Sequence, residues 1–383
     1  MKRNYIARRF QSIGGGLSLD TEALAKYKDI IDLSIGDTDF TTDESIINAA
    51  FRDAKAGHTH YGDPKGDPEL IDAVCRAWEE DFGQRLPRDH VLVSASSCLG
   101  MALVMLAILD PGDEVIVFSP YFPMYREQIE LAGGVCVDVP TYASEDYAID
   151  EARLRAAITP RTKAIVFNNP ANPTGMGYDS GTLELLARVA QEHDLLIAAD
   201  EIYTTYLYEG DFRPLRTLPG MAQRTVTLNS FSKNFLMTGW RVGVIIAEPE
   251  LLAAMNRING SLVYSAPSVS QRAAIQALAM RKEIRKKYVT AYRDRIFYSA
   301  DRIEKLPYLS LVRPKGTFYL FPGVEKTGLD EKAFCKLLLD QAHVLVSPGT
   351  PFGVSAAGHF RIACTVGIDR LKTAFDRMEK LSF

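Results

Sequence analysis

Apolar segments of strand length alternate with amphipathic segments of helical length through the middle of the chain. The expected strands are residues 90–94, 113–119, 135–139, 162–168, 195–200, 224–230 and 240–247. Helical patterns occupy residues 98–109, 121–134, 150–158 and 180–194. Strands that are apolar at most positions are covered on both faces, and their alternation with helices indicates parallel pairing. The pattern predicts an α/β fold with a doubly wound, mostly parallel sheet, which binds ligands at the carboxyl ends of its strands.

The pattern changes after Pro267. A long helical stretch over residues 270–306 precedes a region in which short strands and helices mix. Strands are expected at residues 309–314, 316–322, 343–349 and 358–366, and helices at 330–342 and 367–381. We therefore expect a large domain over residues 41–285 and a smaller α+β domain made of residues 1–40 and 286–383.

Composition excludes two classes of partner. Of the 383 residues, 47% are hydrophobic and 24% are charged, the balance of a globular protein with a full core. The formal net charge of −4 argues against a nucleic-acid partner. The longest apolar run, residues 99–109, is too short to span a bilayer, so we expect no membrane partner.

Three further features indicate a cytoplasmic protein without a metal. The basic segment at residues 1–16 has no apolar stretch behind it, so we do not expect a secretory signal. The five cysteines are scattered, odd in number and form no CxxC pair, which favours reduced thiols. His58 and His60 have no third ligand type nearby, so no metal site is expected there.

The common glycine-rich phosphate motifs are missing. The chain has no GxxxxGK[ST] segment, and no GxGxxG lies between an expected strand and a helix. Gly14–Gly16 follow no expected strand, and we expect them to form a flexible arm. If a phosphate binds, other residues must hold it.

Polar side chains follow three neighbouring strands. The segment "NNPANPTG" follows residues 162–168, and its prolines hold the amide of Asn172 in one place. Asp200 ends the next strand, where a carboxylate is costly unless it pairs with a cation or caps a helix. Tyr203 lies three residues on, and Lys233 follows the strand after that. We expect an amide, a carboxylate, a phenol and an amine at one edge of the sheet.

The surroundings of Lys233 suggest its chemistry. A partly desolvated amine beside another cation becomes a nucleophile, and Arg241 is a candidate for that cation. Arginine with the hydroxyls of Ser230 and Ser232 also suits a phosphate group. An amine that attacks carbonyls, a phosphate pocket and an aspartate for a pyridinium nitrogen together indicate pyridoxal 5′-phosphate.

These segments resemble a known family. "NPTG", "DEIY" and "SFSKNFLMTGWR", in this order, resemble the class I/II aminotransferases of the aspartate aminotransferase fold type. The resemblance extends over nearly the whole chain, through "IDLSIGDTDF", "YGDPKGDPEL", "DPGDEVIVFSPYFPMY" and "GHFRIACTV". It implies a pyridoxal-phosphate transferase fold, with the cofactor bound by the large domain.

The resemblance also implies roles at the cofactor. Lys233 would bond to the cofactor and then move a proton between the substrate Cα and the cofactor carbon. Asp200 would keep the pyridine nitrogen protonated, while Asn172 and Tyr203 would donate to the phenolic oxygen. Phe122, which without the resemblance is better explained as a core aromatic, would stack on the ring.

Other matches concern the phosphate, the substrate and the subunits. The phosphate would be held by Ser230 and Arg241 and by the start of the helix at residues 98–109, namely Ser96, Ser97 and Cys98. Cys98 departs from the polar side chain of many relatives, although backbone N–H groups still suit an anion. Arg361 would bind the substrate α-carboxylate together with Asn172, and Gly36 would let the backbone approach it. Tyr61 would reach the phosphate of a neighbouring subunit, which makes the protein a homodimer with shared active sites.

The predicted function is amino transfer between an L-amino acid and a 2-oxo acid by a ping-pong mechanism. A carbon–sulfur β-lyase of the cystathionine or cysteine-conjugate type is the alternative, since it shares the fold, the cofactor and the first proton transfer. A non-catalytic regulator with this fold is a second alternative, but no basic DNA-binding module precedes Ile30. No second arginine is placed for an acidic substrate, so the side-chain specificity stays open.

Overall fold

The computed structural model describes residues 5–7 and 27–383. Gly14–Gly16 and most of the basic N-terminal segment lie outside the described residues, so the expected arm is not addressed. Within the described part of the chain, no helix is both long and apolar enough to cross a membrane.

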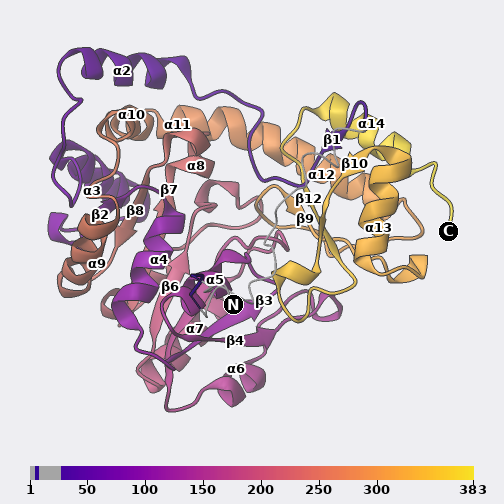
Figure 1. The fold of residues 1–383 in the computed structure, drawn as a ribbon, viewed down its shortest axis with the longest axis horizontal. Helices are drawn as coiled ribbons and strands as arrows, with labels where there is room; N and C mark the ends of the chain where they lie inside the picture. The colour runs from indigo at the N-terminus through magenta and orange to yellow at the C-terminus, as the bar shows by residue number, and fades with distance from the viewer. Residues whose placement is uncertain (1–4, 8–26) are drawn as a thin grey trace.

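A seven-stranded sheet forms the centre of the larger part of the molecule (Figure 1). In sheet order its strands are β2 (Val91–Ser94), β8 (Gly243–Ile246), β7 (Thr225–Ser230), β6 (Leu196–Asp200), β5 (Thr162–Asn168), β3 (Glu114–Ser119) and β4 (Val135–Pro140). All pairings are parallel except those of β8, which runs antiparallel to β2 and to β7. The predicted doubly wound, mostly parallel sheet is confirmed, and every one of its strands overlaps a predicted one.

Helices cover both faces of this sheet because alternate strand residues point to opposite sides. Val115 and Val117 pack in one apolar cluster with α4 (Ser97–Ile108), α5 (Met124–Leu131) and α9 (Pro249–Leu262). Ile116 and Phe118 pack in another cluster with α7 (Ser180–Glu192). The predicted apolar strands are therefore covered on both faces, except for the edge strand β4, in which only Val139 is fully buried.

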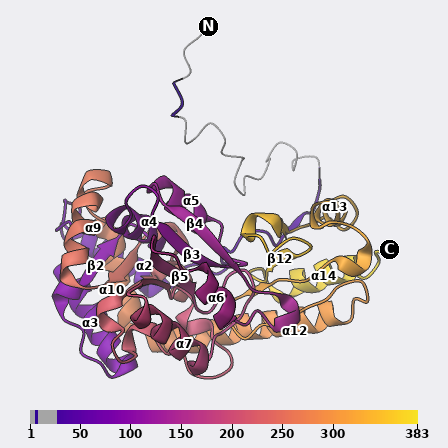
Figure 2. The same cartoon turned by 90° about the horizontal axis from the view of Figure 1, so that it is seen from below.

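A third apolar cluster lies where β2 and β8 meet three helices. These helices are α2 (Glu44–Lys55), α3 (Pro68–Phe82) and α10 (Ser268–Ala279). The sequence pattern did not predict the first two, and it indicated only part of the third. The long helical stretch expected over residues 270–306 is interrupted at Met280, whose φ of −99° and ψ of 11° end α10. It continues as α11 (Arg281–Ile284), a π-helical segment (Arg285–Val289) and α12 (Thr290–Glu304), which runs across to the C-terminal elements (Figures 1 and 2).

The C-terminal region carries two small sheets. Strand β1 (Ile31–Asp32) pairs in parallel with β10 (Val344–Leu345). The other sheet has the order β11 (Ser347–Pro348), β12 (Phe360–Ala363), β9 (Tyr319–Leu320), all antiparallel. Helices α13 (Glu331–Leu337), which continues into a π-helical turn (Leu338–Ala342), and α14 (Ile368–Met378) pack beside α12 and these sheets.

The prediction of a strand at residues 309–314 is wrong. Only Ser310 pairs there, exchanging backbone hydrogen bonds of 3.1 and 2.9 Å with Gly323. Pro314 has no N–H to offer a ladder, so the apolar side chains of this segment pack without strand pairing. The other C-terminal strands are shorter than expected but lie within the predicted segments.

Candidate active site

The carboxyl ends of β5, β6 and β7 meet at one edge of the large sheet. Asn168, the last residue of β5, stands in register with Asp200, the last residue of β6. Ser230 ends β7, and the short helix α8 (Phe231–Asn234) places Lys233 directly beyond it. These ends border a cavity of about 530 Å³, a volume suited to a cofactor with a small substrate.

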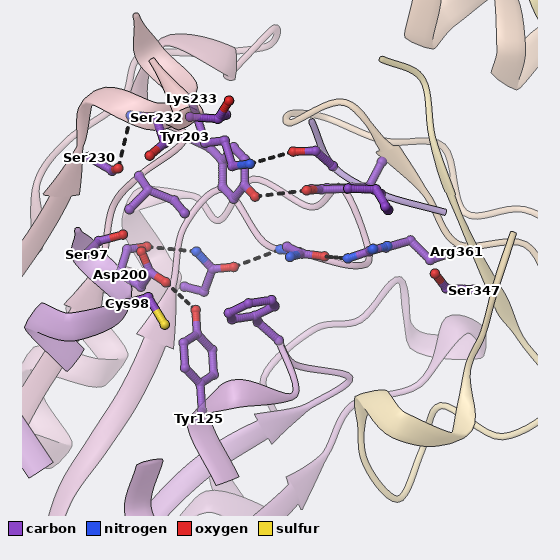
Figure 3. A pocket seen from close by; sticks show the side chains of 18 of the residues that line it. Ser97, Cys98, Tyr125, Asp200, Tyr203, Ser230, Ser232, Lys233, Ser347 and Arg361 are labelled. Atoms are coloured by element: carbon purple, nitrogen blue, oxygen red, sulfur yellow. Dashed lines mark hydrogen bonds between the residues drawn. The ribbon is translucent and has the colours of Figure 1, made fainter. Parts of the chain in front are cut away.

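Twelve of the thirteen predicted site residues line this cavity (Figure 3). They are Gly36, Ser96, Ser97, Cys98, Phe122, Asn172, Asp200, Tyr203, Ser230, Lys233, Arg241 and Arg361. Ser232, expected beside the lysine, lines it as well. Tyr61 does not: it is 87% exposed, and its ring meets Tyr264 edge to face at 5.1 Å.

Asp200 is a buried carboxylate with one oxygen satisfied. The hydroxyl of Tyr125 donates to Oδ2, whereas Oδ1 is buried and has no hydrogen-bond partner among the described residues. Burial raises the pKa of Asp200 to about 6, against the lowering effect of the Tyr125 hydrogen bond. Burial and the neighbouring carboxylate raise the pKa of Tyr125 well above its ordinary value, so this phenol remains a donor. Oδ1 is thus open to a cationic donor in the cavity.

Lys233 is held by the local structure at the end of β7. Ser230 caps α8, since its Oγ accepts the N–H of Ser232 at 3.1 Å. The Nζ atom of Lys233 donates to the carbonyl of Gly36, from a segment nearly 200 residues away in sequence. A Cβ atom at Gly36 would lie 1.8 Å from the hydroxyl of Tyr319. Glycine is therefore required here for Tyr319 to pack against this backbone.

Arg361 is a buried guanidinium whose partners are neutral. Nη1 donates to Oδ1 of Asn172 at 3.1 Å and Nη2 to the carbonyl of Ser34 at 2.6 Å. The guanidinium carbon lies 4.7 Å from the ring centroid of Tyr319, and Nε is buried with no partner in the described structure. Because none of these partners is a carboxylate, the guanidinium has no counter-ion here and can bind an anion in the cavity.

Tyr203 is held by a second phenol. Its hydroxyl lies 3.1 Å from the hydroxyl of Tyr319, and burial raises the pKa of Tyr203 well above the ordinary value. The position of Asn172 is fixed by its backbone, because the backbone N–H donates to Oδ1 of Asn168 at 2.8 Å. Both predicted donors are therefore positioned by residues that we did not predict.

Five residues predicted to hold a phosphate line the cavity, and we call them the anion cradle: Ser96, Ser97, Cys98, Ser230 and Arg241. Ser96 caps α4, with Oγ accepting the N–H of Leu99 at 3.1 Å, so the helix begins where the sequence predicted. The N–H groups of the first helical turn lack intrahelical partners and form the positive end of the helix dipole. Burial raises the pKa of Cys98, so this side chain stays a neutral thiol.

Glycine permits this helix to come so close to the sheet. A Cβ atom at Gly243 would lie 2.6 Å from the backbone nitrogen of Ser97. Gly243 pairs with Ser230 on one side and with Ser94 on the other. The start of α4 thereby comes beside the end of β7.

Tyr125, Tyr319 and Asn168 are the main residues that sequence reasoning missed. Tyr125 lies three residues after Phe122, at the start of α5, where the spacing places both on one side of a helical turn. Tyr319 lies in the predicted strand segment "GTFYLFP" but offered no separate signal. Asn168 was quoted within "NNPANPTG" without a role.

The cavity fits pyridoxal phosphate. The unpartnered Oδ1 of Asp200 suits a protonated ring nitrogen, and Lys233 suits its aldehyde carbon. The anion cradle suits the phosphate, and the donors Asn172 and Tyr203 suit the phenolic oxygen. In the part of the chain that the structure covers, no group of three or more His, Cys, Asp or Glu side chains is arranged to hold a metal ion.

Comparisons with known proteins agree with this fit. The family model "Aminotransferase class I and II" matches residues 28–378. The aspartate/prephenate aminotransferase of Thermus thermophilus is 38% identical, over 98% of both chains. The arginine–pyruvate transaminase of Pseudomonas aeruginosa is 35% identical, over 93% of this chain and 91% of its own.

A solved structure has the same fold over the same length. The aspartate aminotransferase of Thermotoga maritima superimposes with a TM-score of 0.92 at 32% identity, covering 98% of this chain and 99% of its own. A family match of this extent, together with relatives above 30% identity, establishes the family. The chain belongs to the class I and II aminotransferases, which are pyridoxal-phosphate-dependent enzymes.

Proposed function

We propose that this cavity transfers an amino group between an L-amino acid and a 2-oxo acid, which react one after the other in a ping-pong cycle. One observation carries the proposal: Lys233, the buried Asp200 and the guanidinium of Arg361 line a single cavity. An amine, an anion for the ring nitrogen and a cation for a carboxylate are the three groups that the reaction requires. Figure 3 shows Arg361 across the cavity from Asp200.

The bound cofactor would supply an aldehyde carbon and an electron-withdrawing pyridinium ring. Asp200 would hold the ring nitrogen in its protonated form through Oδ1. Asn172 and Tyr203 would donate to the phenolic oxygen, and Phe122 would pack on one ring face. Ser96, Ser97, Cys98, Ser230 and Arg241 would hold the phosphate.

Substrate handling would fall to three residues. Arg361 would bind the α-carboxylate through its planar guanidinium, close to the backbone at Gly36. The amine of Lys233 donates to the Gly36 carbonyl in this structure. In the reaction it would take the proton from the substrate Cα and deliver it to the cofactor carbon. Fixing the carboxylate and the ring orients the bond from Cα to hydrogen, so that this bond breaks in preference to the others.

The two alternative functions, a carbon–sulfur β-lyase and a non-catalytic regulator, have less support than amino transfer. The relatives reported above are transaminases, and the family model is that of aminotransferases. A β-lyase would need an acid for the departing sulfur, and none of the proposed roles provides one. A regulator that senses an amino acid could keep the same three groups, but the relatives reported above are enzymes.

Labelling of Lys233 tests this proposal. Borohydride reduction of the cofactor-loaded protein should attach the cofactor to Lys233, as located by peptide mass spectrometry. Lys233→Ala should lose both the label and the visible absorption band, because lysine is the residue of this lining that can bond to an aldehyde. Attachment to a different lysine would refute the assignment.

We further propose a homodimer in which each subunit contributes Tyr61 to the other subunit's phosphate site. Tyr61 is absent from its own cavity and is 87% exposed, next to the partly exposed Tyr264. A phenol so placed, in a segment that resembles a family motif, suits a contact across a two-fold axis.

Two more proposals concern the domain boundaries and the cellular location of the protein. We propose that residues 41–285 form one domain and that residues 1–40 and 286–383 form the other. The separate core cluster that unites Ile31 and Leu33 with α12 and α14 supports this division for the described residues. All five cysteines are free thiols, which supports a cytoplasmic protein.

A further inference from the structure

Charged side chains are few along the described lining of the cavity. Three are cations, Lys233, Arg241 and Arg361, and one is an anion, Asp200. In the proposed function Lys233 bonds to the cofactor, Arg241 holds its phosphate and Arg361 holds the substrate's α-carboxylate. No cation of this lining is left for a second carboxylate on the substrate, and no anion is left for a basic group.

Apolar side chains, in contrast, follow or precede two of the residues that contact Arg361. Ile35 follows Ser34, whose carbonyl accepts from Arg361, and Ile35 is 52% exposed where it lines the cavity. Pro351 precedes Phe352, whose ring centroid lies 4.9 Å from the guanidinium carbon. Both side chains are therefore close to the place where the α-carboxylate is expected to bind.

The strand that pairs with Arg361 adds one more apolar side chain. Ser347 is opposite Arg361 in the β11–β12 ladder, and Pro348 follows it and lines the cavity, whereas Val346 is buried in the core of the C-terminal region. The hydroxyl of Ser347 is already used, because it donates to the Ser34 carbonyl at 3.0 Å. This part of the lining therefore offers apolar surface rather than a free polar group.

We propose that the amino-acid substrate carries an uncharged apolar or aromatic side chain, which packs against Ile35, Pro348 and Pro351. The inference rests on the proposed aminotransferase function. A substrate carboxylate or ammonium in this place would lose water without gaining a counter-ion from the described lining, which is strongly unfavourable. An apolar side chain would instead cover exposed apolar surface such as Ile35.

A substrate panel provides the first test. The cofactor-loaded enzyme is mixed with single amino acids, and the first half-reaction is followed by the absorbance of the cofactor. Leucine, methionine and phenylalanine should have kcat/KM values at least ~100-fold above those of aspartate, glutamate and lysine, the range over which a site rejects an ill-matched group. Calorimetry with unreactive acids gives a second readout: 4-methylpentanoate should bind more tightly than succinate.

A charge placed at Ile35 provides the second test. Ile35→Lys should raise kcat/KM for aspartate by about tenfold or more and lower that for leucine, because it adds the missing counter-ion. Val354→Lys is the matched control, since Val354 is 64% exposed but does not line the cavity. It should change neither value.

The outcomes distinguish a failure of the side-chain inference from a failure of the proposed function. Aspartate, glutamate or lysine as the fastest substrate would overturn the side-chain inference while leaving the aminotransferase function intact, and would mean that a counter-ion comes from outside the described lining. An unchanged substrate ratio in Ile35→Lys would also overturn it. If no amino acid converts the cofactor, the proposed function itself fails, and the inference fails with it.

Discussion

At the scale of single residues, Tyr125 determines which oxygen of Asp200 faces the cavity. Its hydroxyl occupies Oδ2 and leaves Oδ1 free, and it opposes the rise in pKa that burial causes. Since the ring nitrogen would bind the ionised carboxylate, cofactor affinity should fall as the pH drops below about 6. Tyr125→Phe removes one hydrogen bond to a charged group, so this fall should begin about 1–2 pH units higher.

The measurement is the dissociation constant of pyridoxal phosphate at several pH values. Tyr121→Phe is the control, because the Tyr121 hydroxyl accepts from Nε of Arg126 at 3.0 Å and does not border the cavity. Its profile should match that of the unaltered protein. Identical profiles for all three proteins would show that Tyr125 does not act on Asp200.

The next residue, Glu201, is a buried acid that the proposed mechanism does not use. Burial raises its pKa from 4.5 to about 8, although Oε1 accepts the N–H of Leu215 at 2.9 Å. A raised carboxyl pKa stabilises the fold fully below the unfolded pKa, and this contribution is lost as the pH rises through the folded value.

The free energy of unfolding of the cofactor-free protein should therefore fall between pH 5 and pH 8. Glu201→Gln keeps an oxygen for Leu215 but cannot ionise, so most of this fall should vanish, a difference on the order of 4 kcal/mol at most. Urea unfolding at both pH values measures it. Equal pH dependence in the two proteins would show that Glu201 is not the group responsible.

At the scale of secondary-structure elements, the sequence was informative wherever a signal is local. Apolar runs predicted all seven strands of the large sheet, and the residues that end β6 and β7 were correctly brought to one edge. Tyr125 and Tyr319 were missed because their partners are distant in sequence, 75 residues away at Asp200 and 116 at Tyr203. Residues 309–314 were misassigned because apolar side chains alone do not reveal whether a neighbouring strand is available.

The close approach of α4 to β8 makes a second element-scale prediction. In Gly243→Ala the added methyl group must displace the backbone at Ser97, whose nitrogen would otherwise lie 2.6 Å from it. Cofactor affinity should fall by about tenfold or more, because the first N–H groups of α4 lose their position. Gly239→Ala, in the same segment but with open space around its Cβ, is the control. Equal dissociation constants for the two variants would contradict the role of this contact.

At the scale of the whole molecule, the proposed dimer predicts complementation. A mixed dimer of Lys233→Ala with Tyr61→Ala has one intact site, since Lys233 comes from one subunit and Tyr61 from the other. Mixing equal amounts under exchange should restore about a quarter of full activity. Lys233→Ala mixed with Arg361→Ala should stay inactive, because these two residues line the same subunit's cavity. Full activity in a protein that sediments as a monomer would refute shared sites.

The antiparallel strand β8 has a consequence for the order in which the chain acquires its structure. Strand β2 pairs in the large sheet with β8 alone, so residues 91–94 cannot join the sheet before residues 243–246 have been synthesised. During synthesis, about 150 residues must leave the ribosome before the start of α4 is held against the end of β7. Until then β2 and β7 present unpaired edges that invite association with other chains. The anion cradle, our proposed phosphate site, is therefore completed late. Cofactor binding by a nascent chain would report that β8 has joined the central sheet.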